Sequence, residues 1–418
     1  MKKLMLYFCL GWSVLPGLSQ GLELAEVLQK AEQQSPLQAQ RNLWQSQKVL
    51  QLENVQTMWM PRLDLQGRLS WQSDVVTFPE LGGSVSFPEI PKTQYNLSLN
   101  LNQALYDGGQ SRYLRTLTEA SFLTKEKELA AQLFSLKPML TQLYFGIVLL
   151  DRQQQVVESS QEVLAANYKV VASGVKNGVV LQSELEKFER QQASLQQQWD
   201  ELQGQKAALV ASLKIWVGED ISVETEFALP EVAENQASQR PELALFDAQQ
   251  GMARLQAESL GAQRLPKVGA FAQGGLGRPN PFNFLEVNTS PFFMAGVQFN
   301  WNIWDWKRTQ RDQQNLAIQE NLIEVYREQH QDQVALQVAQ EEAEIETMRR
   351  LLEQDTRLIA LQESILSRVN TQLQNGTVKP SDYLQEVEAL TQSKLQQQIH
   401  EVRLRQSEVE RAIHQGKY

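Results

Sequence analysis

The sequence contains almost no cysteine. Of its 418 residues one is a cysteine, Cys9. It lies in the N-terminal stretch MKKLMLYFCLGWSVLPGLSQG. There two lysines precede an apolar run, Leu4–Leu15, which is followed by a short segment rich in small residues, Pro16–Gly21. This pattern is typical of a secretory signal peptide, and we expect residues 1–20 to be removed by cleavage between Ser19 and Gly21. An uncleaved anchor is the alternative, but the run is shorter than the roughly 20 residues of a spanning helix.

Long apolar runs and an excess of positive charge are also missing. Without Cys9 the mature chain works outside the cytosol and has no disulfides. No later segment has the ~18 consecutive apolar residues of a membrane helix. The net charge of −10 argues against a nucleic-acid partner, because a surface that neutralises phosphates needs a basic excess. Such an exported chain is soluble in the periplasm, secreted, or inserted in an outer membrane as strands.

Histidines are few, and no catalytic motif accompanies them. His330, His400 and His414 are scattered along helical stretches, and we expect them at the surface. None lies at ligand spacing from a cysteine or an acid, or beside a nucleophile motif. The sequence has no phosphate-binding loop and no GxSxG. We therefore predict that the protein is not an enzyme and that it has no metal site and no cofactor.

The chain contains an internal repeat. The segment LNQALYDGG corresponds to FNWNIWDWK, and their aspartates, Asp107 and Asp305, are 198 residues apart. The segment NGVVLQSEL corresponds to NGTVKPSDY, and their glycines, Gly178 and Gly376, are also 198 residues apart. Two landmarks with one offset indicate two copies of one plan.

Each copy has a helix, two strands and a long helical hairpin. We assign residues 21–216 to the first repeat, 217–239 to a linker and 240–418 to the second repeat. The opening helices are predicted from Leu22 to about Met58 and from Pro241 to about Ala262. The strands are predicted at about 61–73, 94–105, 266–276 and 293–304, and the hairpins at 110–215 and 307–416.

The strands alternate between apolar and polar residues. In QYNLSLNLN, residues 94–102, every second residue is apolar, which predicts one apolar and one polar face. Strands of this length can cross a bilayer when tilted, and their terminal aromatics suit its interfaces. An ordinary soluble sheet with one buried face is the alternative, which the strands alone leave open.

The helices are too long for a globular domain. Residues 308–374 show only a helical period, and at 1.5 Å per residue such a helix is on the order of 100 Å long. Its two apolar seams predict neighbours on both sides. One seam contains Met348, Leu352, Ile359, Leu366 and Val369, and the other Leu351, Leu358, Leu361 and Ile365. In the first repeat, Pro138 predicts a kink that its counterpart Leu336 does not.

Four strands cannot close a barrel on their own. Single-chain barrels have at least about eight strands, and an open sheet edge is not tolerated in lipid. If these strands span a membrane, several chains must therefore share one barrel. A soluble periplasmic or surface coiled-coil scaffold is the alternative class.

This plan resembles the TolC family of outer-membrane efflux and secretion channels of Gram-negative bacteria. The resemblance is carried by the Pro-led strands, the corners QALYDGG and WNIWDWK, RPEL at residues 240–243 and the paired NGxVxxS[ED] segments. It implies a mainly α fold with a small β part. Three chains would share a 12-stranded barrel in the outer membrane and an α-helical coiled-coil tunnel in the periplasm.

The resemblance also implies partners. The homotrimer would be a passive exit duct of a tripartite efflux or type I secretion system. It would contact outer-membrane lipid, a periplasmic adaptor (membrane fusion protein) and an inner-membrane transporter. Drug, metal, lipid and protein cargo all remain open.

In this family the Asn-Gly breaks lie at the periplasmic tip, where the tunnel closes. By resemblance, Glu184 and Asp382 would form carboxylate rings that select cations. The family's arginine of the closing bonds is replaced by Val180 and Val378, which predicts a gate held by apolar packing. A further family acid is replaced by Lys187 and Gln385. The alternative for the two acids is favourable charge and serine capping at a helix start.

Two further sets of residues follow from the resemblance. The tip residues that would meet the adaptor are Gly178, Val179, Gly376 and Thr377. A plain helix-helix turn without a partner is their alternative. The side chains that would face lipid are Leu63, Leu65, Leu69, Trp71, Tyr95, Leu97, Leu99, Leu101, Val297, Phe299 and Trp301.

Overall fold

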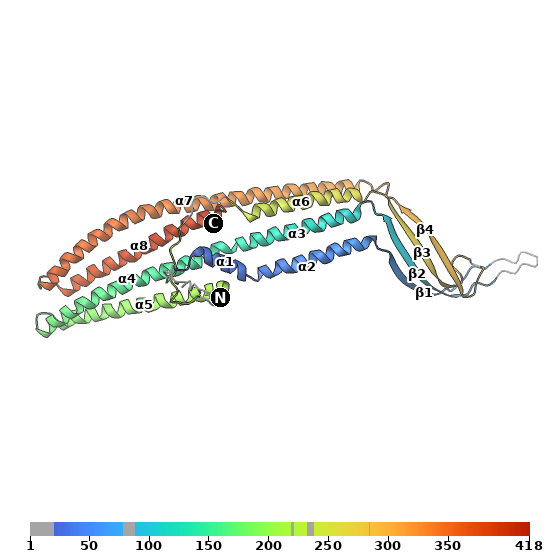
Figure 1. Cartoon of the computed structure of the whole chain (residues 1–418). Coiled ribbons are helices and arrows are strands. Elements are labelled where there is room, and N and C mark those ends of the chain that lie inside the picture. Colours follow the sequence, from blue (N-terminus) through green and yellow to red (C-terminus); the bar gives the residue numbers. More distant parts are fainter. Residues whose placement is uncertain (1–20, 78–87, 219–220, 232–237, 284) are drawn as a thin grey trace, which may run out of the picture. The chain divides into compact units, whose positions relative to one another are not determined.

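Figure 1 shows the computed structural model of the chain, which describes residues 21–77, 88–218, 221–231, 238–283 and 285–418. The predicted signal peptide, residues 1–20, lies outside the described residues. The elements are α1 (Leu24–Gln34), α2 (Leu37–Gln56), η1 (Thr57–Trp59), β1 (Arg62–Trp71), β2 (Thr93–Tyr106), α3 (Gln110–Phe134), α4 (Leu136–Lys176), α5 (Gln182–Val217), α6 (Pro241–Ala262), β3 (Lys267–Arg278), β4 (Ser290–Asn300), α7 (Arg308–Gln374) and α8 (Pro380–His414).

The mainly helical fold class is confirmed, and the four strands form one antiparallel sheet in the order β1-β2-β3-β4. The register aligns Leu63 with Leu101 and Leu101 with Ala272, so the apolar residues of neighbouring strands share one face. All four strands lie within three residues of their predicted starts and four of their predicted ends. Period-two alternation therefore located the sheet and its faces.

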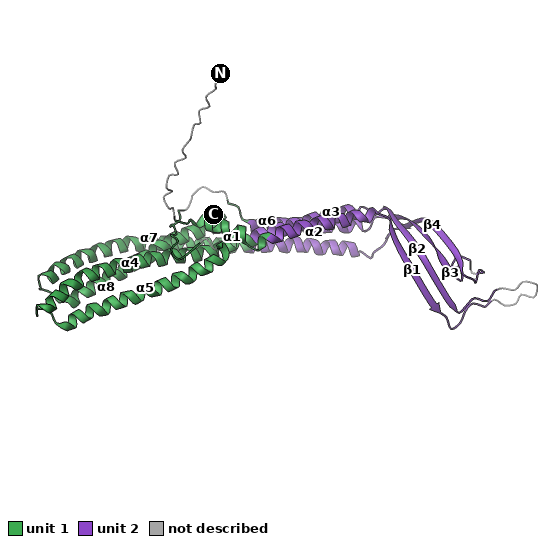
Figure 2. Cartoon of the chain, turned by 60° about the horizontal axis from the view of Figure 1, so that its bottom comes forward, with its two compact units in different colours: residues 1–38, 132–240, 330–418 green, residues 39–131, 241–329 purple. Residues whose placement is uncertain are grey.

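The chain divides into two compact units, coloured in Figure 2. Unit 1 contains residues 1–38, 132–240 and 330–418, and unit 2 contains residues 39–131 and 241–329. Each unit takes segments from both sequence repeats. The boundaries of the compact units therefore do not coincide with those of the sequence repeats.

Two apolar clusters hold unit 1 together. The first packs α1 against α4, α5 and the end of α8, with Leu24, Tyr144 and Leu213 fully buried. The Tyr144 hydroxyl lies 2.6 Å from the carbonyl oxygen of Leu22 and 2.5 Å from that of Ala228, which satisfies its polar end inside this core. The second cluster joins α4, α5, α7 and α8 toward the Asn-Gly turns.

Prolines interrupt the helices in the first repeat. The single helix predicted from Leu22 to Met58 is wrong, because α1 ends before the Ser35–Pro36 bond and α2 follows it. Ser35 has ψ 130°, the extended conformation that a following proline enforces. The kink predicted by Pro138 is confirmed as a break at Ser135, between α3 and α4, whereas α7 continues unbroken.

One later stretch is more apolar than the search for unbroken runs revealed. Within Gln110–Lys176, one 18-residue window is apolar enough by length and composition to cross a membrane. Half of that window is buried within the chain, as in the core helix of a folded unit. The expectation of no later membrane-like segment therefore holds only for uninterrupted apolar runs.

Candidate functional site

The first strand-to-helix corner, between β2 and α3, is closed by Asp107. Its carboxylate accepts hydrogen bonds from the backbone N–H groups of Gly109, at 2.8 Å, and Ser111, at 2.7 Å. Gly108 and Gly109 have φ of 69° and 82°, a left-handed conformation that glycine adopts readily. Burial alone would raise the pKa of Asp107, but its hydrogen bonds with Ser111 and Gly109 outweigh burial and the pKa is lowered.

The second corner, between β4 and α7, repeats this geometry with other residues. The Asp305 carboxylate accepts the backbone N–H of Thr309 at 3.0 Å and also its hydroxyl, and these bonds lower the pKa of Asp305. The positions of the two glycines are taken by Trp306 and Lys307, whose φ values are 55° and 62°. Corresponding positions of the two corners, 198 residues apart, thus have the same backbone conformation.

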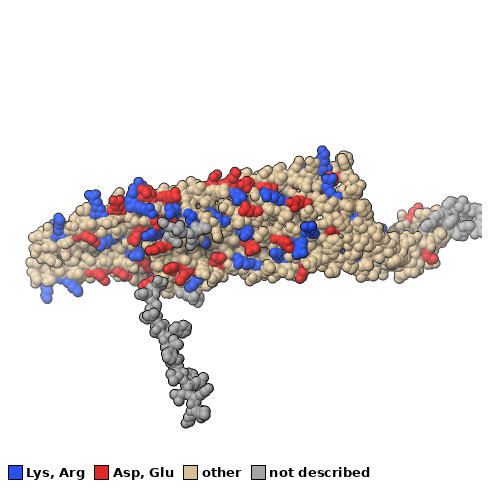
Figure 3. All heavy atoms as spheres, turned by 45° about the horizontal axis from the view of Figure 1, so that its top comes forward, with Lys and Arg blue, Asp and Glu red and all other residues tan. Residues whose placement is uncertain are grey.

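One face of the sheet is apolar and uncovered. Every residue predicted to face lipid is exposed, from 37% for Tyr95 to 76% for Leu69. In the space-filling view of Figure 3, charged side chains are spread over the helices, whereas few appear on the visible part of the sheet. A soluble sheet buries such a face against another layer, so this surface requires an apolar neighbour outside the chain.

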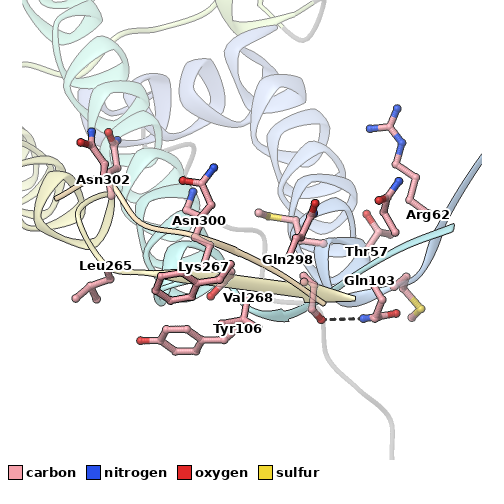
Figure 4. Close-up of a pocket in the computed structure, with 18 residues that line it drawn as sticks. Thr57, Arg62, Gln103, Tyr106, Leu265, Lys267, Val268, Gln298, Asn300 and Asn302 are labelled. Atoms are coloured by element: carbon pink, nitrogen blue, oxygen red, sulfur yellow. Dashed lines mark hydrogen bonds between the residues drawn. The ribbon is translucent and has the colours of Figure 1, made fainter. Parts of the chain in front are cut away.

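The opposite face carries polar residues on β1 and β2. The register places Arg62 beside Asn102 and Asp64 beside Asn100. Where the strands meet the helices, this region borders a cavity of about 660 Å³ in unit 2, lined by polar side chains such as Gln103 and by apolar ones such as Leu265 and Val268 (Figure 4). A sheet with one apolar and one polar face fits a boundary between lipid and water.

The sheet has two free edges. Within the residues that the structure describes, β1 pairs only with β2, and β4 pairs only with β3. Each outer strand therefore presents unpaired backbone N–H and C=O groups along one side. In a membrane these groups need strands from another chain, because lipid offers them no hydrogen bonds.

The first Asn-Gly turn, between α4 and α5, exposes its apex. Gly178 has φ 71°, and its N–H donates to Val175 O at 3.0 Å, while Val179 N–H donates to Gly174 O at 3.0 Å. This is the glycine-terminated Schellman end of a helix. The Val179 side chain is 78% exposed at the apex, whereas Val180 packs against the second core cluster.

The second turn, between α7 and α8, has the same bonds 198 residues later. Gly376 has φ 70°, its N–H donates to Leu373 O at 3.0 Å, and Thr377 N–H donates to Gln372 O at 2.9 Å. Gly376 and Thr377 are exposed, and Val378 packs against the second core cluster. The two valines thus pack within their own chain, and the four apex residues are accessible.

Glu184 is held between the two hairpins. One carboxylate oxygen accepts the backbone N–H of Ser381 at 2.9 Å, and the other pairs with Lys187 at 2.7 Å. The Glu184 side chain is only 12% exposed. Burial alone would raise its pKa, but the bonds from Lys187 and Ser381 outweigh burial and the pKa is lowered. Glu184 therefore ties the start of α5 to the start of α8.

Asp382, the counterpart of Glu184, has a different environment. It is exposed at the third residue of α8, where the helix dipole favours a negative charge. The residues that cap α5 and α8 are Leu181 and Lys379, and neither cap has a side-chain hydrogen bond. The alternative of serine capping is therefore not observed, and the two acids differ in accessibility.

An aromatic contact that the sequence did not reveal lies behind the turns. The rings of Phe188 and Tyr383 stack with centroids 6.3 Å apart and an interplanar angle of 2°. The Tyr383 hydroxyl accepts a bond of 2.6 Å from the Asn167 amide. The signal available was the apolar period of α8, in which Tyr383 is followed by the buried Leu384 and Val387.

The histidines are not all at the surface. The expectation is wrong for His400, which is buried with its Nδ1 2.6 Å from the Asp355 carboxylate and its Nε2 2.8 Å from the Gln396 amide nitrogen. This polar cluster links α7 with α8. In the described part of the chain, no group of three or more His, Cys, Asp or Glu residues is placed to hold a metal ion.

An open amphipathic sheet joined through capped corners to long helices is an arrangement that this chain shares with solved outer-membrane channels. A family model described as outer membrane efflux protein matches residues 27–219. The matched stretch lies almost entirely within the first repeat and its helical hairpin, and it covers a little under half of the chain. No curated protein matches the sequence.

Solved channels share the fold at low sequence identity. The CmeC outer membrane channel of Campylobacter jejuni has 15% identity and a TM-score of 0.67, with 94% of this chain and 85% of CmeC covered. CusC, described with transmembrane channel formation, has 16% identity and a TM-score of 0.70, with 94% and 92% covered. VceC of Vibrio cholerae has 15% identity and a TM-score of 0.68, with 94% and 96% covered.

Proposed function

We propose that three copies of this chain form a passive exit duct through the outer membrane. Each chain contributes its four strands to one 12-stranded barrel, and its long helices to a tunnel that extends into the periplasm. The duct receives cargo from an inner-membrane transporter through a periplasmic adaptor, in an efflux or type I secretion system. It supplies no energy of its own.

One observation carries this proposal: the sheet has an uncovered apolar face, a polar opposite face and two free edges. A bilayer covers the apolar face, water fills the polar side, and strands of neighbouring chains satisfy the edges. A soluble coiled-coil scaffold is not favoured, because it would leave all three features in water. A catalytic role has no support from the family, whose related structures are channels.

The two seams of α7 support the association of several chains. The side chains of Met348 and Ile359, in the first seam, are buried within the chain. In the second seam Leu358, Leu361 and Ile365 remain exposed. An exposed apolar seam beside a buried one fits a helix in the wall of a tube, with a neighbouring chain against its free side.

At the periplasmic tip, Asp382 lines the opening and three copies form a ring of carboxylates that favours cations. Glu184 contributes less because its carboxylate is engaged within the chain. Val180 and Val378 keep the tip packed. The exposed residues Gly178, Val179, Gly376 and Thr377 form the surface for the adaptor.

Fractionation and crosslinking test the assembly. We expect the protein in the outer-membrane fraction, with a crosslinked species of three chains. A cysteine pair placed on β1 and β4 would form a disulfide between chains and not within one. Recovery as a soluble monomer would overturn the proposal.

Conductance in planar bilayers tests the carboxylate ring. We expect a cation-selective pore whose cation-to-anion permeability ratio falls in Asp382→Asn and falls less in Glu184→Gln. An Asp382→Glu variant, which keeps the charge, is the matched control. Unchanged selectivity in Asp382→Asn would remove the ring from the proposal while leaving the pore itself.

A further inference from the structure

The first residues of the connection between β3 and β4, residues 279–282, fold back over the polar face of the sheet. Gly277 lies on this face, two residues along β3 from Gly275. A Cβ atom built on Gly277 would lie 2.9 Å from Pro281 Cδ and 3.6 Å from the Phe292 ring. The space above Gly277, toward which a side chain would point, is therefore occupied by residues of the connection and of β4.

Two phenylalanines meet at this place. Phe292 is aligned with Gly275, which is aligned with Ser98, so its ring lies on the polar face. Phe282, in the connection, meets this ring edge-on, with centroids 5.2 Å apart and planes at 87°. Phe292 is 7% exposed and Phe282 is 50% exposed. Phe282 thus covers Phe292 and presents its own ring to the space above the polar face.

Asn280 fixes the connection in this position. Its side-chain oxygen accepts the backbone N–H groups of Phe282 at 2.9 Å and Asn283 at 3.2 Å. Its side-chain nitrogen donates to Ser290 Oγ at 2.9 Å, and its backbone N–H donates to Glu286 O at 2.9 Å. The hydrogen bonds of Asn280 therefore join both ends of this turn, and they hold the backbone of Phe282 in place.

We infer that Phe282, supported by Phe292 and positioned by Asn280, forms an outer constriction of the lumen that hinders bulky solutes entering from outside the cell. This inference rests on the proposed function, because it takes the polar face as the wall of the lumen. It assigns a permeability-determining site to the barrel, separate from the acids and valines of the periplasmic tip.

The size of the barrel makes such a site effective. Barrels of eight strands are filled by their own side chains, and barrels of 16–18 strands leave an aqueous channel. A 12-stranded barrel lies between these cases. A connection folded inward from each of three chains therefore narrows its outer end, and an aromatic rim offers few hydrogen bonds to a hydrated solute.

A single-cysteine experiment tests the inference. The mature chain is expected to contain no cysteine, so Met294→Cys provides one thiol on the polar face, two residues along β4 from Phe292 and away from the connection. Whole cells are treated from outside with a small or a bulky membrane-impermeant thiol reagent. Removing the ring by Phe282→Ala should raise the labelling rate of the bulky reagent by about threefold or more, which corresponds to a free-energy barrier to its passage that is lower by about 0.65 kcal/mol. The rate of the small reagent should stay unchanged.

Two controls accompany this measurement. Leu285→Ala removes an apolar side chain of similar exposure, 47%, from the same connection and should leave both labelling rates unchanged. Asn280→Ala keeps Phe282 but releases the connection, and it should raise the rate of the bulky reagent as Phe282→Ala does. Crosslinking to three chains verifies that each variant assembles.

The outcomes separate the inference from the proposed function. One outcome overturns the outer constriction and leaves the proposed duct unaffected. In this outcome the small reagent labels Met294→Cys, and neither Phe282→Ala nor Asn280→Ala raises the labelling rate of the bulky reagent. Val297→Cys places the thiol on the apolar face. If the small reagent labels it as fast as Met294→Cys, the polar face is not the lumen, and the proposed function fails together with the inference.

Discussion

The two strand-to-helix corners have the same backbone and different residues. At the first, Gly108 and Gly109 take positive φ without a side chain, whereas at the second Trp306 and Lys307 are held there with side chains. In both, an aspartate at the preceding position accepts a backbone N–H from the first turn of the following helix. The comparison teaches that the aspartate cap and the attached strand impose this corner, and that glycine only makes it less costly.

The two Asn-Gly turns also share one backbone conformation, but their acids differ in environment. Their backbone bonds match one for one, yet Glu184 is tied to Ser381 while Asp382 is exposed. Duplication kept the geometry and allowed the side chains to take separate roles. One acid, Glu184, holds the hairpins together, and the other, Asp382, is exposed.

The largest predicted difference concerns the aromatic stack behind the turns. Tyr383 is fully buried, whereas its counterpart Leu185 is only partly buried. Tyr383→Ala should reduce the free energy of unfolding by about 3–5 kcal/mol, and Leu185→Ala by clearly less. The measurement is thermal loss of helical circular dichroism in the solubilised protein. Tyr383→Phe, which loses only the bond to Asn167, should cost about 1 kcal/mol. Equal losses in the two alanine variants would contradict the comparison.

A smaller effect is expected when residues are exchanged between the corners. Gly109→Ala should destabilise by about 1–2 kcal/mol, because of the left-handed φ alone. Space is available there, since the nearest atom to an added Cβ is Tyr113 Cε2 at 4.0 Å. Lys307→Gly should instead stabilise by up to about 1 kcal/mol, because it relieves the same conformation. Unfolding midpoints of the two variants test this, and a destabilised Lys307→Gly would refute the strain at the second corner.

The third prediction concerns pH. The folded pKa of Glu184 is lowered, so its contribution to stability is fully present above its ordinary pKa and is lost as pH falls through the folded pKa. Glu184→Gln should therefore be less stable than the native chain at pH 7, and the difference should shrink on acidification below about 4.5, the ordinary range of a glutamate. The observable is the unfolding midpoint of both chains between pH 7 and pH 3. A difference that stays constant over this range would show that the tie to Ser381 does not depend on charge.

The smallest effect concerns the two corner caps. Asp107→Asn and Asp305→Asn keep an acceptor oxygen but remove the charge. Asp107→Asn should cost a few tenths to about 1 kcal/mol, and Asp305→Asn should lower the unfolding midpoint by less. The loss should be the larger at Asp107, because Asp107 is buried and Asp305 is only partly buried. The same unfolding measurement applies, and a larger loss at Asp305 would reverse the comparison of the corners.

The sequence predicted the sheet and both kinds of turn because their signals are local. Alternation over ten residues places Leu97 and Leu99 on one face, and an Asn-Gly pair ends a helix whatever surrounds it. Pro36 also indicates the break at Ser35–Pro36, but the helical period continues on both sides of it and predicts a single helix instead.

Other features depend on contacts between distant residues. The tie of Glu184 to Ser381 joins residues 197 positions apart, and nothing in the two equivalent segments indicates which acid is engaged. The fold of the β3–β4 connection likewise depends on where the Asn280 side chain points. Composition identifies a Gly/Pro/Phe-rich loop, but not the face of the sheet that it covers.

The two free edges of the sheet have a consequence for how the protein is made. The sheet of this chain has two outer strands with unpaired backbone groups and one uncovered apolar face. In water such an edge can pair with any other strand that it meets. In the proposed duct the two edges are therefore satisfied only when the chain pairs with its neighbours in the membrane. In the proposed duct the number of chains is then set by closure: once the sheets of neighbouring chains form a ring, no free edge is left to which a further copy can add.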